Sequence, residues 1–240
     1  MKLYRALQSQ GLGSRRGCAA LVRAGAVLAN GLACADPEAE VDPVGLELTV
    51  DGTVWAYRDK AYLVMHKPEG YECSHHPRHH PSVFSLLPAP LVQRGVQCVG
   101  RLDQDTTGLL LFSDDGQFIH RMTSPKKRVG KVYRARCAEP VNAATLAALR
   151  AGVQLNDEPA PLAALACEAV DDRTLRLVLA EGKYHQVRRM IAAAGNHVAR
   201  LHREAVGEYP LPDDLPPGGW RWLEAGDLQR LECAWPSAKS

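Results

Sequence analysis

Apolar residues near the start of the chain recur first at helical and then at strand spacing. Residues 3–7 and 18–22 carry apolar side chains three or four positions apart, and Ser14 is a suitable N-cap for the second of these helices. The apolar stretch 26–34 contains Asn30-Gly31, a dipeptide typical of type I′ turns. The pattern predicts two helices and a β-hairpin, followed by an acidic linker over residues 36–59.

Strand patterns dominate the rest of the chain. Apolar or alternating runs predict strands at 62–66, 109–112, 132–137 and 174–179. Two helices are also predicted, one from an Asn142 cap to Gly152 and one over residues 185–194. Because strands outnumber helices and their order is mixed, we expect an α+β fold rather than a doubly wound α/β fold.

The composition is that of an ordinary globular protein with one or two domains. The 240 residues are 46% hydrophobic and 23% charged. No apolar run approaches membrane-spanning length, and the N-terminus lacks the apolar core of a signal peptide. The seven cysteines are an odd number without a C-x-x-C pair, which favours reduced thiols. These features predict a cytoplasmic protein that does not associate with membranes.

The positive charges are segregated although the net charge is only +2. Residues 1–35 contain five Lys or Arg, residues 116–138 contain seven, and residues 183–203 contain five, without any Asp or Glu. Segregated basic blocks favour a surface that binds a polyanion. The alternative is three unrelated solvated faces.

The stretch 100–112 combines a charged turn with a buried strand. Arg101 and Asp103 precede the apolar run 109–112. A charged pair held beside a rigid strand is a candidate catalytic site. The alternative is a capped turn in which Asp103 binds backbone N–H groups.

Two further segments allow both a functional and a structural interpretation. In residues 181–191, helical periodicity directs Val187 and Met190 inward and places Arg188 on another face of the helix. Arg188 is therefore either a solvated arginine or the fixed partner of a buried carboxylate. Tyr133, after a basic loop, is either a half-buried strand residue or an aromatic face on which a nucleobase stacks.

In order and spacing, these segments resemble the RsuA/RluB/E/F-type family of ribosomal RNA pseudouridine synthases. His185-Gln186-Val187 and Leu201-His202-Arg203 are most similar to the small-subunit branch. The matching segments cover nearly the whole chain beyond the N-terminal unit; they are 67–74, 100–111, 131–133, 152–155, 181–190, 195–198, 201–204 and 215–223. The resemblance implies a catalytic domain with a mixed, largely antiparallel sheet flanked by helices.

The N-terminal unit resembles an S4-type RNA-binding domain. Ser14-Arg15-Arg16, the segment 23–27 and Asn30-Gly31 carry the likeness. We therefore predict an S4-like RNA-binding domain with its linker at 1–57 and a catalytic domain at 58–240.

The family resemblance implies a mechanism. Asp103 would attack the target uridine at C6 of uracil or at C1′ of the ribose, and the sequence leaves both open. Arg188 would keep this carboxylate charged, and Tyr133 would stack on the base and help remove the C5 proton. Leu177 would contact the base, and Arg101 would fill the stack that the flipped nucleotide vacates. The reaction is an isomerisation and needs no cofactor, metal or energy source.

We expect Asp105 to bind backbone amides of the turn. The Cys73/His-rich loop over residues 73–80 lacks paired cysteines, which favours a polar loop near RNA over a metal site. The predicted RNA-binding residues, besides Arg101 and Leu177, are basic or polar positions: Arg15, Arg16, Arg23, Lys126, Lys127, Arg128, Lys131, Lys183, His185 and Gln186.

The resemblance predicts a monomer that modifies a uridine of small-subunit (16S) ribosomal RNA, free or in an assembly intermediate. Two alternatives remain at this stage. One is a synthase for large-subunit (23S) RNA, and the other is a non-catalytic RNA-binding or ribosome assembly factor that keeps the fold.

Overall fold

The computed structural model describes residues 1–233 and divides them into two compact units. The first contains Met1–Ala61 and Leu87–Gln97; the second contains Tyr62–Leu86 and the described chain from Cys98 onward. The predicted boundary at residue 57 had left Leu87–Gln97 in the second domain. This segment joins the first unit because the Arg94 guanidinium binds Oε1 of Gln10 and the carbonyl oxygens of Arg58 and Asp59, each at 3.0 Å.

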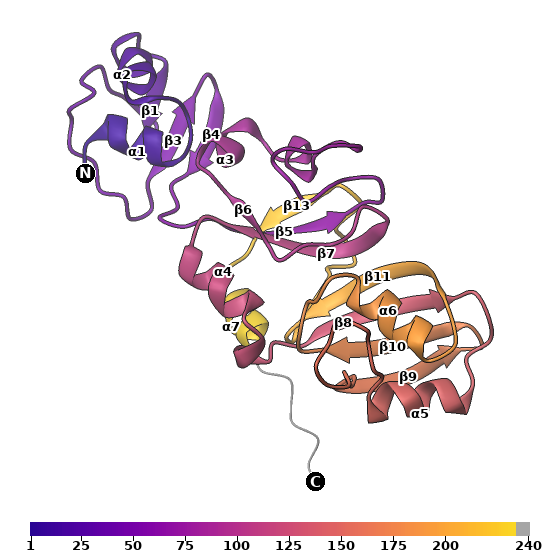
Figure 1. The fold of residues 1–240 in the computed structure, drawn as a ribbon. Helices are drawn as coiled ribbons and strands as arrows, with labels where there is room; N and C mark the ends of the chain where they lie inside the picture. The colour runs from indigo at the N-terminus through magenta and orange to yellow at the C-terminus, as the bar shows by residue number, and fades with distance from the viewer. Residues whose placement is uncertain (234–240) are drawn as a thin grey trace. The chain divides into compact units, whose positions relative to one another are not determined.

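The first unit combines short helices with a four-stranded antiparallel sheet in the order β2-β1-β3-β4 (Figure 1). The predicted helices and hairpin are present, with the Ser14 side chain accepting the Gly17 N–H and positive φ at Asn30 and Gly31. The linker prediction was wrong for residues 47–56, which form a second hairpin. The elements are α1 (Leu3–Ser9), α2 (Arg15–Arg23), β1 (Val27–Ala29), β2 (Leu32–Ala33), β3 (Glu47–Val50), β4 (Thr53–Ala56) and α3 (Ala89–Gln93).

A nine-stranded sheet organises the second unit. Its order is β13-β5-β7-β11-β8-β10-β9, with β12 on β11 and β6 on β7. The β7–β11 pair is parallel, whereas the other pairs along this path are antiparallel, so the mixed, largely antiparallel sheet is confirmed. The strands are β5 (Tyr62–Lys67), β6 (Gln97–Val99), β7 (Thr106–Ser113), β8 (Lys131–Cys137), β9 (Ala166–Asp171), β10 (Thr174–Leu179), β11 (Val198–Val206), β12 (Tyr209–Pro210) and β13 (Trp220–Trp222).

Helices cover the sheet at separate places. In Figure 1, α4 and α7 lie side by side, while α5 lies next to β9 and contacts α6, which packs against β11. The α+β class is confirmed, as are the Asn142 cap and the Gly152 end of α5. The helical segments are η1 (Val83–Leu86), α4 (Gly116–Thr123), η2 (Pro125–Lys127), α5 (Ala143–Ala151), α6 (Gln186–Ala193) and α7 (Ala225–Glu232).

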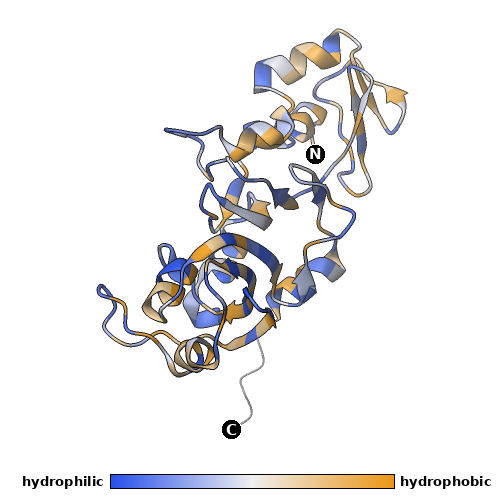
Figure 2. Cartoon of the chain, turned by 90° about the vertical axis from the view of Figure 1, so that its right-hand side faces the viewer, coloured by the Kyte–Doolittle hydropathy of each residue, from blue (hydrophilic) through white to orange (hydrophobic). Residues whose placement is uncertain are grey.

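Strand β7 lies in the interior of the second unit. Leu109, Leu110, Leu111 and Phe112 are each at most 1% exposed, which confirms the predicted buried strand. Helices such as α6 carry hydrophobic positions on one side and hydrophilic positions on the other, as the mixed colours of the helices in Figure 2 illustrate. Within residues 1–233, no helix is both long enough and apolar enough to cross a bilayer.

Candidate active site

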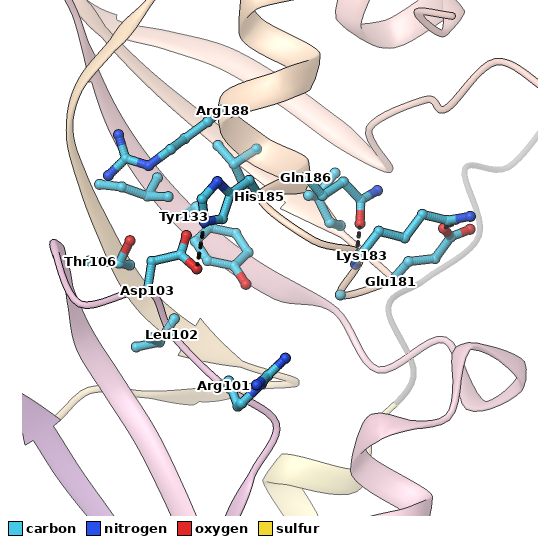
Figure 3. Close-up of a pocket in the computed structure, with 14 residues that line it drawn as sticks. Arg101, Leu102, Asp103, Thr106, Tyr133, Glu181, Lys183, His185, Gln186 and Arg188 are labelled. Atoms are coloured by element: carbon cyan, nitrogen blue, oxygen red, sulfur yellow. Dashed lines mark hydrogen bonds and ion pairs between the residues drawn. The ribbon is translucent and has the colours of Figure 1, made fainter. Parts of the chain in front are cut away.

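The turn between β6 and β7 carries Asp103 into a small cavity. Side chains from this turn, from β8 and from the start of α6 surround about 70 Å³ of space (Figure 3). Arg101, Asp103, Tyr133, His185 and Arg188 all line it, so residues far apart in the sequence converge on one place. Asp103 is about one third exposed, with 35% of its side chain accessible.

A buried lysine supports this turn from beneath. Lys67, the last residue of β5, is 0% exposed, and its ammonium donates to the carbonyl oxygens of Pro68, Gln104 and Thr106 at 3.0, 3.2 and 2.9 Å. Burial lowers the pKa of Lys67, and the charges of nearby Cys73, Asp105 and Asp103 oppose this shift. The lysine therefore holds the backbone on both sides of Asp105, and the sequence analysis included it only as part of the matching segment 67–74.

Replacing Lys67 with Met is expected to destabilise the protein by about 3 kcal/mol, because three inward-facing carbonyl oxygens lose their donor. Urea denaturation measures this loss. Lys60→Met is the matched control, since Lys60 is exposed and its replacement should change the free energy of unfolding by less than about 0.5 kcal/mol. Equal stability of the two variants would show that the lysine is not needed to hold the turn.

The acidic residues of the turn pair with bases in an arrangement that differs from the prediction. His185 Nε2 lies 3.3 Å from Asp103 Oδ1, whereas Arg188 Nη2 lies 2.8 Å from Asp105 Oδ2. Arg188 was expected to pair with Asp103, and Asp105 to bind backbone amides. Figure 3 shows the dashed contact between His185 and Asp103.

Strand register explains this choice of partners. Thr106 lies opposite Leu201 in the parallel β7–β11 pair, so Asp105 lies beside the early part of β11. The Arg188 guanidinium also donates to the carbonyl of Val198 at 3.3 Å, which anchors it over the same part of β11. Helix α6 begins at Gln186 rather than at the predicted residue 185. His185 takes a left-handed conformation at its N-cap, with φ 47°, and reaches Asp103 from there.

Tyr133 forms an aromatic wall of the cavity and is 8% exposed. Leu177 pairs with it across the β8–β10 ladder but is completely buried and does not line the cavity, whereas Leu179, two residues further along β10, does. Both leucines face the same side of β10, because strand side chains alternate with period two. Leu179 rather than Leu177 is therefore the residue of β10 that is accessible from the cavity.

Comparison with known proteins decides what kind of site this is. Residues 61–193 match the family described as RNA pseudouridylate synthase. The chain belongs to this family.

Its relatives and fold agree with this membership. The synthase is 41% identical over 187 residues to ribosomal small subunit pseudouridine synthase A of Vibrio cholerae, covering 78% of each chain. It is 42% identical over 167 residues to the Escherichia coli K12 protein of the same name, covering 70% of this chain and 72% of that protein. A crystal structure of a pseudouridylate synthase is similar with a TM-score of 0.68 and 32% identity, covering 96% of this chain and 99% of that one.

The residues predicted to bind RNA fall into accessible and inaccessible groups. Six of them are exposed on α2 or around η2: Arg15, Arg16, Arg23, Lys126, Lys127 and Arg128. Arg101 is exposed at the cavity. These seven cations remain predicted RNA contacts of the synthase.

The prediction for Lys131 was wrong. Its ammonium points inward and donates to the carbonyls of Val129 and Ala180 at 3.0 and 3.4 Å, and burial lowers its pKa to about 8. Gln186 is 6% exposed and its Oε1 accepts the Lys183 N–H, so it mainly shapes the loop before α6. Lys183 lines the cavity but forms ion pairs with Glu158 and Glu181. Sequence spacing does not show where a long side chain points, which is why Lys131 was misjudged, whereas Lys183 and Gln186 line the cavity and stay predicted RNA contacts.

The Cys/His-rich loop is organised by a carboxylate. Glu72 accepts the backbone N–H groups of Arg78, His79 and His80 at 2.8–3.0 Å, and these bonds lower its pKa to about 2. The ring of His75 stacks on Phe84 with centroids 3.6 Å apart. Backbone and packing contacts thus define the conformation of this loop.

Proposed function

We propose that this synthase isomerises a uridine of small-subunit (16S) ribosomal RNA to pseudouridine, acting as a monomer with Asp103 as the nucleophile. The observation that carries the proposal is the convergence of Asp103, Tyr133, His185 and Arg188 on one cavity in a chain 41–42% identical to small-subunit synthases.

The geometry supports a division of roles. Asp103 is accessible enough to reach a substrate atom, and the His185 Nε2 atom lies 3.3 Å from its Oδ1 atom, which places an imidazole beside the carboxylate. A carboxylate is both a nucleophile and a leaving group, as required when the glycosidic bond breaks and C5 then bonds to C1′. The base turns between these two steps and needs a flat surface, which Tyr133 provides, and an apolar one, which Leu179 provides.

Arg188 acts through Asp105 in this proposal. Its ion pair with Asp105 at 2.8 Å fixes the residue two positions after the nucleophile, and its bond to Val198 fixes the arginine itself. Arg188 is therefore a positioning residue in the structure before RNA binds. Arg101, exposed at the rim, has the length and planar charge to occupy the stack that the flipped uridine leaves.

The first unit is proposed as the RNA-docking domain. Helix α2 presents Arg15, Arg16 and Arg23 to solvent, and the three lie on a nine-residue helix without an acidic residue. Such a cluster binds phosphates with little dependence on sequence. Arg15 also lies over the ring of Tyr4, 5.0 Å from its centroid, which limits its motion.

The test is a reaction with defined RNA. Purified protein is incubated with transcripts of small-subunit and of large-subunit ribosomal RNA, and pseudouridines are mapped at single-nucleotide resolution. We expect one new pseudouridine in the small-subunit RNA. Modification confined to the large-subunit RNA would overturn the assignment of the target. Binding without any modification would instead identify a non-catalytic RNA-binding factor.

A further inference from the structure

A buried threonine hydroxyl at the active-site cavity has no partner in the protein. Thr106 is the first residue of β7 and is 0% exposed. Its hydroxyl oxygen forms no hydrogen bond with any group of residues 1–233. Thr106 lines the active-site cavity, and Figure 3 shows its hydroxyl at the edge of that cavity beside Asp103. Because an unpaired buried hydroxyl costs free energy, such a group normally has a partner.

The backbone of Thr106 holds this hydroxyl in place. The Thr106 N–H donates to the carbonyl oxygen of Asp103 at 3.1 Å, and the Thr106 carbonyl oxygen accepts from the Lys67 ammonium at 2.9 Å. A threonine side chain also has few χ1 rotamers, because its Cβ atom is branched. The hydroxyl is therefore fixed relative to the nucleophile before any substrate enters.

The next residue of β7 is a threonine whose hydroxyl has a partner. The Thr107 hydroxyl oxygen lies 2.8 Å from Nδ1 of His202. Because side chains alternate along a strand, Thr107 and Thr106 point to opposite faces of the sheet. On β11, Thr106 pairs with Leu201, which lines the active-site cavity, and Thr107 pairs with His202, which lines another cavity. The fold thus supplies a partner for one hydroxyl and leaves the other for a group that enters the active site.

We propose that the Thr106 hydroxyl donates a hydrogen bond to a carbonyl oxygen of the target uracil, and that this bond strengthens as the glycosidic bond breaks. The inference rests on the proposed function. When the C1′–N1 bond breaks, its electron pair stays on the base, and resonance spreads the negative charge to the oxygens at C2 and C4. Attack at C6 also places charge on the oxygen at C4. Both routes that the sequence leaves open therefore produce an acceptor for this donor.

The spacing of the strands leaves room for such a contact. Strand β11 lies between β7 and β8, so the backbones of Thr106 and Tyr133 are at least about 10 Å apart. A pyrimidine that stacks on the Tyr133 ring can therefore extend a carbonyl edge toward Thr106. A donor that is fixed in a buried cavity before charge develops stabilises the transition state more than the bound substrate. Thr106 is in this proposal a catalytic residue, since it touches the reacting base.

The first test compares two valine variants. Thr106→Val removes the hydroxyl but keeps the branched shape, so the urea midpoint should stay unchanged or rise, because no hydrogen bond is lost in the free protein. In single-turnover reactions with saturating protein, its rate of pseudouridine formation should fall at least about tenfold, with RNA binding changed by less than about threefold. Thr106→Ser should restore most of the rate. The control Thr107→Val should lower the midpoint, because His202 loses its partner, and leave the rate unchanged.

The second test identifies the contacted atom. Synthetic RNA carries 2-thiouridine or 4-thiouridine at the position that the wild-type protein modifies, because sulfur is a weaker hydrogen-bond acceptor than oxygen. One of the two thio substitutions should slow the wild-type protein by at least about fivefold and leave the rate of Thr106→Val unchanged, since both changes remove the same contact. The position that shows this coupling is the oxygen bound by Thr106.

Three results would overturn the inference. The first is a Thr106→Val protein with the wild-type rate. The second is a pair of thio substitutions that slow the wild-type protein and Thr106→Val equally. The third is a urea midpoint that falls as far in Thr106→Val as in Thr107→Val, since the hydroxyl would then stabilise the free protein. Wild-type protein is assayed first on unmodified RNA, so that absence of any product there refutes the proposed function and not the role of Thr106.

Discussion

Asp103→Asn is expected to lower the rate of pseudouridine formation by at least roughly 10³-fold, because an amide oxygen is a far weaker nucleophile than a carboxylate. The substitution keeps the size and shape of the side chain, and the residue is about one third exposed, so the fold should be unchanged. The rate is measured in single-turnover reactions with saturating protein. Binding of the same RNA should change by less than about threefold, since phosphate contacts dominate affinity.

Asp213→Asn is the control for this substitution. Asp213 is an exposed carboxylate of the same unit outside the active-site cavity, and its replacement should leave the rate unchanged. A fully active Asp103→Asn protein would refute the assignment of the nucleophile.

The variant Asp105→Asn distinguishes the role of Asp105 from that of Asp103. It breaks the ion pair with Arg188 but leaves the Asp103 carboxylate in place, so we expect a partial loss, on the order of tenfold, rather than an abolished rate. Arg188→Met should produce a loss of similar size, and the double variant should be no worse than the larger single effect, because both remove the same contact. If Asp105→Asn abolished the reaction and Asp103→Asn did not, the roles of the two acids would be exchanged.

Gly108→Ala is expected to have the largest effect on stability, a loss of at least about 3 kcal/mol. Gly108 has φ +109°, and a Cβ atom placed there would lie 2.3 Å from the carbonyl oxygen and 2.7 Å from the nitrogen of Arg203. These are backbone atoms of β11, so no side-chain rotation can relieve the clash. The Arg203 guanidinium is itself buried and donates to the carbonyl of Leu109 at 2.7 Å, which further locks the two strands together.

Separation of β7 from β11 in Gly108→Ala would also disturb the active site. The β7–β11 pair holds the turn of Asp103 at one end of β7 and the anchor of Arg188 on β11. Urea denaturation of Gly108→Ala is compared with that of Gly116→Ala, at the first position of α4, where a Cβ meets nothing within 4 Å. The control should be neutral or stabilised by up to about 1 kcal/mol, because alanine is the better helix former. Equal midpoints for the two variants would contradict the close approach of the strands.

Local features of the fold were predictable from the sequence where a short-range signal was strong. The strand 174–179 and the helix between Asn142 and Gly152 match the structure, because side-chain periodicity and capping act within a few residues. The hairpin β3–β4 was missed because its residues are partly exposed and lie in an acidic stretch with the composition of a linker. Leu87–Gln97 was misplaced because its contacts with Gln10, Arg58 and Asp59 span many positions of the chain.

By itself, the sequence determined the chemistry of this protein. The motifs around Asp103, Tyr133 and Arg188 resemble those of pseudouridine synthases, and this resemblance is visible without coordinates because residue type and spacing are properties of the sequence. Only the tertiary structure decided how these groups are paired. The register of β7 on β11 brings Asp105 rather than Asp103 to Arg188, and the left-handed cap of α6 brings His185 to Asp103. The first depends on long-range strand pairing, which periodicity does not encode, and the second depends on a left-handed residue at the N-cap of α6, which helical periodicity does not encode either.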